Sequence, residues 1–316
     1  MSTGSCFCKA EIGDLTARLV RLSRCWLLYE LARGNGVIES RNRNGSWARA
    51  AAVLGAYLVF RWTLGVVRLP HATPAALLFV AACVSAAGAI GLPILGISEL
   101  VRRRIPVFGA LALVAAGLGL WLGTAAIGRG WGAPVAGALQ DLGKILAASG
   151  IGIALAAGIK EPNILLPAGV FAAFADFVVV NFGTVKHALS SSKGQQLVQA
   201  VSAQVPAVHA RLPMLTIGPA DFLFLGIFLA CAARFEMGLS KTAAVLAAVL
   251  ALSLILVPII GPIPALAPMS IAFVVVNWRH FRLTRQEIVS TFAVLGVMGL
   301  LFVGYFLWVF PRTVKQ

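Results

Sequence analysis

Two aspartates, Asp176 and Asp221, lie inside long apolar segments of the chain, Ile164–Val185 and Leu212–Ala233. An ionised carboxylate in hydrocarbon is costly, so an acid in such a segment is a functional hypothesis by default. Two carboxyl groups held close together can share one proton, because both cannot ionise cheaply side by side. The ionised group then acts as general base on a water, while the protonated group polarises a carbonyl. Such a pair could hydrolyse a peptide bond without a metal or a covalent intermediate, but two aspartates alone favour an ion pathway or proton relay over a protease.

Helix geometry predicts where the two side chains lie. Asp176 precedes the end of its segment, and Asp221 follows the start of its own, by similar stretches of chain. At about 1.5 Å per residue over about nine residues, both would lie roughly 13–14 Å below the same membrane face. A hairpin of two antiparallel helices would therefore bring the carboxyl groups to matching depth.

The composition predicts the elements that must position these residues. Of the 316 residues, 59% are hydrophobic and only 12% are charged, whereas soluble domains are usually about 45–50% apolar and about 25% charged. The apolar residues come in blocks of about 20, the length that crosses a bilayer as a helix. The short alternating strands of a β-barrel do not appear in the sequence. We therefore expect an all-α, polytopic transmembrane bundle.

About nine apolar segments are long enough to be spans. They lie at about 48–67, 73–97, 106–128, 134–159, 164–185, 212–233, 241–260, 263–277 and 288–310. The longest polar connection, about 186–211, joins the two aspartate segments, and its stretch QQLVQAVSAQV could form an amphipathic surface helix. The predicted parts are a basic N-terminal tail (1–47), N-terminal transmembrane helices (48–160) and C-terminal transmembrane helices carrying both aspartates (161–316). The tail is expected to be a surface-lying basic helix, a disordered segment or an over-long start of the reading frame.

The net charge of +15 does not predict a nucleic-acid partner. Basic residues cluster in short connections such as Arg102–Arg104 and Arg279–Arg285, as the positive-inside bias expects. No basic patch is interleaved with aromatic residues. We expect an integral, multi-pass protein of the cell membrane with the lipid bilayer as its surroundings. The five cysteines match no common zinc framework and no His-Glu-x-x-His motif occurs, so we expect no metal and no cofactor.

Three motifs follow one another in the C-terminal half: Phe174-Ala175-Asp176, Gly218-Pro219-Ala220-Asp221 and Pro264-Ala265-Leu266. Their order resembles the presenilin and signal peptide peptidase family of intramembrane aspartyl proteases. That family carries Tyr-Asp in one helix, Gly-x-Gly-Asp in the next and Pro-Ala-Leu two helices later. The resemblance covers about residues 164–277. The chain departs from the pattern at Ala175, which replaces the tyrosine, and at Ala220, which replaces the second glycine. The aspartates also fall in the fifth and sixth segments, not the sixth and seventh.

The resemblance implies a presenilin-like fold in which Asp176 and Asp221 are the catalytic pair. It implies that Gly218 allows close backbone approach near Asp221. By the same resemblance, Pro264, Ala265 and Leu266 would shape the active-site wall and help to place substrate. The implied substrates are transmembrane protein segments or membrane-bound remnants of signal peptides, and obligatory protein partners are not predicted.

Two other functions stay open at this point. Intramembrane aspartates also mark ion pathways, so a proton-coupled transporter or channel is the main alternative. Asp141 and Lys144 lie three residues apart in the fourth segment and would suit either a proton path or a local ion pair near the interface. A catalytically inactive scaffold of the same fold is the third reading. Arg61, near the end of the first segment, is expected to snorkel to the headgroups.

Overall fold

The computed structural model describes residues 37–70, 72–127, 132–182, 192–207, 209, 215–260, 264–281 and 284–285, with scattered positions between 289 and 304. The chain divides into two units, Met1–Ala48 and Arg49–Gln316. The site described below, and the fold from Arg49 onward, belong to the second unit. Residues 1–36 of the predicted tail lie outside the described residues, as does most of the predicted ninth span at 288–310.

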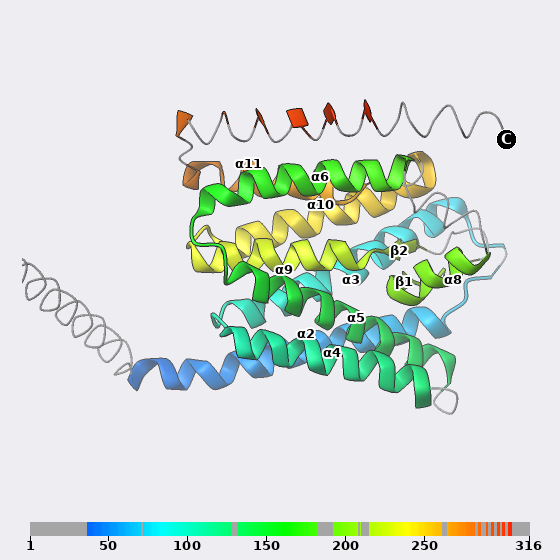
Figure 1. Cartoon of the computed structure of the whole chain (residues 1–316). Helices are drawn as coiled ribbons and strands as arrows, with labels where there is room; N and C mark the ends of the chain where they lie inside the picture. The colour runs from blue at the N-terminus through cyan, green and yellow to red at the C-terminus, as the bar shows by residue number, and fades with distance from the viewer. Residues whose placement is uncertain are drawn as a thin grey trace, which may run out of the picture. The chain divides into compact units, whose positions relative to one another are not determined.

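The described residues form nine α-helices, two short 3₁₀-helices and one pair of strands (Figure 1). In chain order the elements are α2 (Val37–Val66), α3 (Ala75–Val101), α4 (Val107–Ile127), α5 (Ala133–Ala156), η2 (Pro162–Ile164), α6 (Leu165–Phe182), α8 (Ser192–Val201), β1 (Ala203–Val205), β2 (Leu215–Ile217), α9 (Pro219–Arg234), α10 (Leu239–Ile260), α11 (Leu266–Val276) and η3 (Trp278–His280).

Four of the described helices are long and apolar enough to cross a membrane. They lie at Ala75–Val101, Val107–Ala126, Ala133–Ala156 and Leu239–Val257. The apolar stretches Pro162–Phe177 and Leu266–Val276 are helical but shorter. The prediction of a mostly helical chain with helices that could cross a membrane is therefore confirmed, while the count of nine spans stays a prediction.

Helix α5 packs against α4 on one side and α9 on another. Glycines bring α5 and α9 close together. A Cβ atom built on Gly226 of α9 would lie 2.5 Å from the backbone oxygen of Ser149, and one on Gly152 of α5 would clash with the backbone oxygen of Leu223. Small residues of this kind let the backbones of membrane helices approach closely. Helix α9, which carries Asp221, is thus held against α5 by backbone contact.

Helix α11 packs against α6 and α10 and also reaches α9. The rings of Phe228 in α9 and Phe273 in α11 stack with their centroids 4.4 Å apart. Gly169 of α6 faces both neighbours, because a Cβ there would lie 3.4 Å from the side chain of Ser270 and 3.8 Å from that of Phe228. The helices that carry the three sequence motifs therefore meet in one part of the bundle.

A short antiparallel pair of strands precedes α9. Strand β1 pairs with β2, with Gln204 opposite Thr216. The predicted amphipathic helix ends at Val201, so its last residues form β1 instead. The prediction of an entirely helical fold is correct for most of the described chain and wrong at this pair.

The predicted helix from Leu212 is also wrong at its start, because α9 begins only at Pro219. Gly218 adopts an extended conformation (φ −67°, ψ 152°), as expected of a residue that precedes proline. Proline itself favours the first helical position. Asp221 is consequently in the first turn of α9, and the depth obtained from a continuous helix does not apply to it.

Candidate active site

Asp221 is fixed by the backbone at the start of α9. Its Oδ2 atom accepts a hydrogen bond from the N–H of Gly218 over 3.1 Å. The N–H of Asp221 in turn donates to the carbonyl oxygen of Gly218 over 3.2 Å. A carboxylate three residues after the helix cap commonly makes this reciprocal contact, and the helix dipole favours negative charge there. The residue as a whole is only partly buried.

Asp176 lies in α6, within the helix predicted for it, and its side chain is half-buried. Its Oδ2 atom accepts a hydrogen bond from the backbone N–H of Leu266 over 2.9 Å. Leu266 is the first residue of α11, where helix N–H groups have no partner within the helix. The carboxylate of Asp176 therefore caps the start of α11 from a neighbouring helix.

The predicted wall residues lie at this same contact. Leu266 is buried, with 4% of its surface exposed, whereas Pro264 and Ala265 are partly buried. Ala265 is the cap residue of α11, and its carbonyl oxygen accepts the N–H of Met269 over 3.2 Å. The backbone of the Pro-Ala-Leu motif thus holds one of the two aspartates.

The two aspartates lie near enough for the charge of Asp176 to act on Asp221. They come from helices that run in opposite directions, with α9 starting at the end of the bundle that carries β1 and β2 (Figure 1). Each carboxylate is held by one backbone N–H, from Leu266 or from Gly218. The two carboxyl groups are thus held by separate backbone donors within electrostatic range of each other, as a general acid–base pair would need to be.

Of the two departures from the family pattern, Ala220 fits the local structure. Ala220 is exposed, so its methyl group is accommodated without a clash at the start of α9. Gly218 has a φ of −67°, which any residue can adopt. A Cβ built on Gly218 would lie 3.4 Å from Oδ2 of Asp221, at ordinary contact distance. Gly218 therefore positions Asp221 through its backbone N–H group and not through an unusual backbone conformation. Ala175 offers no hydroxyl beside Asp176.

A second group of charged residues was only partly predicted. Arg61 is buried, with 6% of its surface exposed, and its Nη2 atom lies 2.7 Å from Oδ2 of Asp141. The prediction that Arg61 snorkels to the headgroups is wrong, since an internal counter-ion makes its burial less costly. Lys144 forms the predicted local pair with Asp141 over 3.6 Å, and both side chains are buried. The first segment ends on the face where the fourth begins, so the depth argument used for Asp176 could also have paired Arg61 with Asp141.

This charged group holds strand β1. Lys144 donates to the carbonyl oxygen of Ser202 over 2.8 Å, and Asp141 accepts the N–H of Gln204 over 3.3 Å. Strand β1 pairs with β2, and β2 leads directly into Gly218. A continuous set of contacts therefore connects the buried charges of α5 with the residues that position Asp221.

Among the residues that the structure describes, no three His, Cys, Asp or Glu side chains lie close enough together to hold a metal ion.

No protein-family model matches the chain, and neither curated proteins nor solved structures give a match. The chemistry of the site has to be inferred from its geometry.

Proposed function

We propose that the chain is an intramembrane aspartyl endopeptidase of the presenilin type, with Asp176 and Asp221 as its catalytic pair. The observation that carries the proposal is the hydrogen bond from the N–H of Leu266 to Asp176. It joins two motifs 90 residues apart, which the family resemblance had placed in one active site. Asp221, in the Gly-Pro-Ala-Asp motif, is close enough to Asp176 for the two charges to interact, which supports a single site for all three motifs.

In this proposal one carboxyl group is ionised and the other is protonated. The ionised group removes a proton from a water that attacks the scissile carbonyl, and the protonated group hydrogen-bonds to that carbonyl oxygen. The attack gives a tetrahedral intermediate, and transfer of a proton to the amide nitrogen releases the amine. Titration belongs to the pair, so neither Asp176 nor Asp221 is assigned the shared proton.

Strand β2 is the proposed site of substrate pairing. A helical substrate shields its peptide bonds by its own hydrogen bonds, so it must unwind before cleavage. Strand β2 pairs with β1 along one edge, and we propose that an extended substrate segment pairs with its other edge, because strand addition uses the backbone N–H and C=O groups of a sheet edge. Because Gly218 follows β2 directly, a substrate paired there would run toward Asp221. The proposed substrates are transmembrane segments or signal-peptide remnants in the cell membrane, cleaved by a multi-pass protein.

The test is proteolysis of a panel of transmembrane peptides by the purified chain reconstituted in liposomes. Asp176→Asn and Asp221→Asn should each lower the cleavage rate by about 100-fold or more, because each removes an acid–base group. Glu161→Gln is the matched control, since Glu161 is an exposed acid between α5 and α6. Full cleavage by either aspartate variant would refute the proposal.

The buried charges around Asp141 favour one alternative, a proton-coupled transporter or channel. Arg61, Asp141 and Lys144 are all buried in apolar helices, and such groups mark proton paths in membrane proteins. The alternative predicts flux into liposomes that Asp141→Asn abolishes, without cleavage of any peptide. An inactive scaffold would show neither activity.

A further inference from the structure

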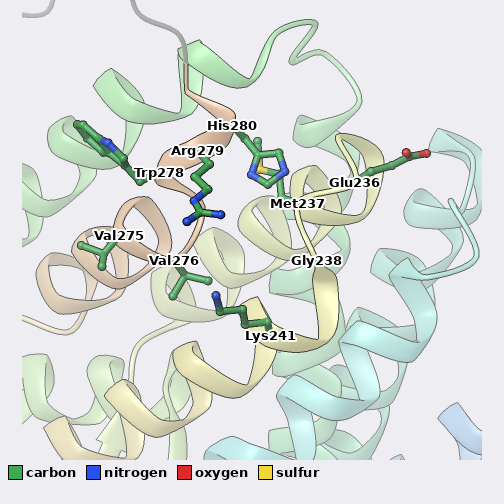
Figure 2. Close-up of a pocket in the computed structure, with 9 residues that line it drawn as sticks. All are labelled: Glu236, Met237, Gly238, Lys241, Val275, Val276, Trp278, Arg279 and His280. Carbon is green, nitrogen blue, oxygen red and sulfur yellow. The ribbon is translucent and has the colours of Figure 1, made fainter.

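A second site lies at the end of the bundle opposite to β1 and β2. The turn between α9 and α10 and the end of α11 enclose a pocket of about 600 Å³. This volume is within the range of about 300–1,000 Å³ that is usual for small-molecule sites. The pocket is lined by Glu236, Met237, Gly238, Lys241, Val275, Val276, Trp278, Arg279 and His280 (Figure 2). It shares none of these residues with the candidate active site.

The polar lining of the pocket is basic. Lys241 at the start of α10 and Arg279 in η3 point toward the same space, with His280 beside them (Figure 2). Glu236 is the one acidic lining residue among the described ones, and it forms an ion pair of 2.8 Å with Arg104 outside the pocket. The charge of Glu236 is thus compensated by Arg104, which does not line the pocket. The lining therefore carries an excess of positive charge from Lys241 and Arg279.

The two basic walls are held in place by a buried hydrogen bond. Thr242, next to Lys241, donates its hydroxyl to the side-chain oxygen of Asn277 over 3.2 Å. The amide nitrogen of Asn277 donates to the carbonyl oxygen of Phe273 over 2.9 Å. Both Thr242 and Asn277 are fully buried. The hydrogen bond therefore fixes the two backbone segments from which Lys241 and Arg279 extend.

An exposed apolar strip on α11 and η3 runs to the pocket. Ile271, Val275 and Trp278 follow at helical spacing and are 64%, 66% and 63% exposed. Tryptophan is enriched at the boundary between membrane and water. Buried Met237 and half-buried Val276 add apolar surface to the lining. The site thus combines an apolar outer face with a basic head.

We propose that this pocket binds an anionic glycerophospholipid, with the phosphate between Lys241 and Arg279 and an acyl chain along Ile271 and Val275. Arginine matches the geometry of phosphate oxygens with its planar fork, and lysine supplies a compact charge. Basic pockets between transmembrane helices are known to bind anionic headgroups. The proposal does not depend on the proteolytic function.

The test uses the full chain in phosphatidylcholine nanodiscs containing increasing amounts of phosphatidylglycerol with brominated acyl chains, which quench tryptophan fluorescence. Quenching should saturate at a low fraction of phosphatidylglycerol, and Trp278→Phe should remove most of the saturable part. Lys241→Ala and Arg279→Ala should each weaken the apparent affinity by about five-fold, since each basic residue near anionic lipid contributes about 1 kcal/mol. Lys160→Ala removes one exposed cation outside the pocket and is the matched control.

Two further arms identify the ligand. Brominated phosphatidylcholine alone should quench without saturation, and inorganic phosphate added at millimolar concentration should not displace the phosphatidylglycerol. Displacement by inorganic phosphate would show that the pocket takes free phosphate and would overturn the lipid assignment. Equal losses in Lys160→Ala and Lys241→Ala would also overturn it, since the effect would then come from net charge alone. Because Lys241 and Arg279 are exposed, their variants should keep the melting temperature of the parent chain.

Discussion

The N–H of Leu266 lies 2.9 Å from the Oδ2 atom of Asp176, so the first residue of one helix is held by the side chain of another. Because of this hydrogen bond, Asp176 has a structural role in addition to its proposed catalytic role, and substitutions at Asp176 can distinguish the two. Asparagine retains a side-chain oxygen that can accept the same hydrogen bond, whereas leucine does not.

We expect Asp176→Asn to be inactive but nearly as stable as the parent chain. Asp176→Leu should be inactive and also less stable, by about 1–3 kcal/mol, because the N–H of Leu266 would lose its partner. Reversible unfolding in mixed detergent, followed by circular dichroism, measures the difference between the two variants. Equal stability of the asparagine and leucine variants would contradict the structural role of this hydrogen bond.

A pair of substitutions at Gly218 tests the hydrogen bond that holds Asp221. Gly218→Ala keeps the N–H group and should leave cleavage within a few-fold of the parent rate. Gly218→Pro removes the N–H group, and its required φ of about −65° matches the observed −67°. We expect it to lower the cleavage rate by about ten-fold or more without unfolding the chain, because a hydrogen bond to a charged group is lost. The rates of both variants on one reporter peptide decide the matter, and full activity of Gly218→Pro would show that this donor is dispensable.

Removing one partner from the buried ion pair of Arg61 and Asp141 should be strongly destabilising. Asp141→Leu leaves two buried cations without their counter-ion and should cost about 3–5 kcal/mol. The triple variant Arg61→Met, Asp141→Leu, Lys144→Met removes the charges together and should recover most of that loss. Unfolding free energies of the two variants test this. A triple variant no more stable than Asp141→Leu would show that the loss did not come from unpaired charge.

Close packing of α5 against α9 gives a prediction that does not involve charge. Gly226→Ala places a methyl group 2.5 Å from the backbone oxygen of Ser149. Such overpacking should cost about 1–3 kcal/mol. Gly119→Ala in α4 meets open space and should leave stability unchanged or slightly raised. Melting temperatures measured side by side provide the comparison, with equal values contradicting a close α5–α9 contact.

The sequence predicted the helices well because apolar length and periodicity determine them locally. It placed Asp176 in the correct helix and grouped it with Leu266, but helix rise alone carries no information about rotation. The hydrogen bond between them therefore had to come from the three-dimensional structure. The start of α9 was missed although Gly218-Pro219 gave a local signal, since an apolar run of spanning length was read as one helix. The position of Arg61 was predicted wrongly because the snorkelling argument uses only the side chain and the membrane surface. It takes no account of Asp141, a counter-ion 80 residues away in the sequence.

The contact between Asp141 and the N–H of Gln204 has a consequence for the order of assembly. Asp221 takes its described position through β2, β2 pairs with β1, and β1 is held by residues of α5. Helix α5 precedes β1, β2 and α9 in the chain, so we expect the earlier helices to provide the surface on which the segment that carries Asp221 packs. A C-terminal half produced alone would insert its aspartates without this surface, and co-expression of the two halves is the condition under which the described geometry could be restored.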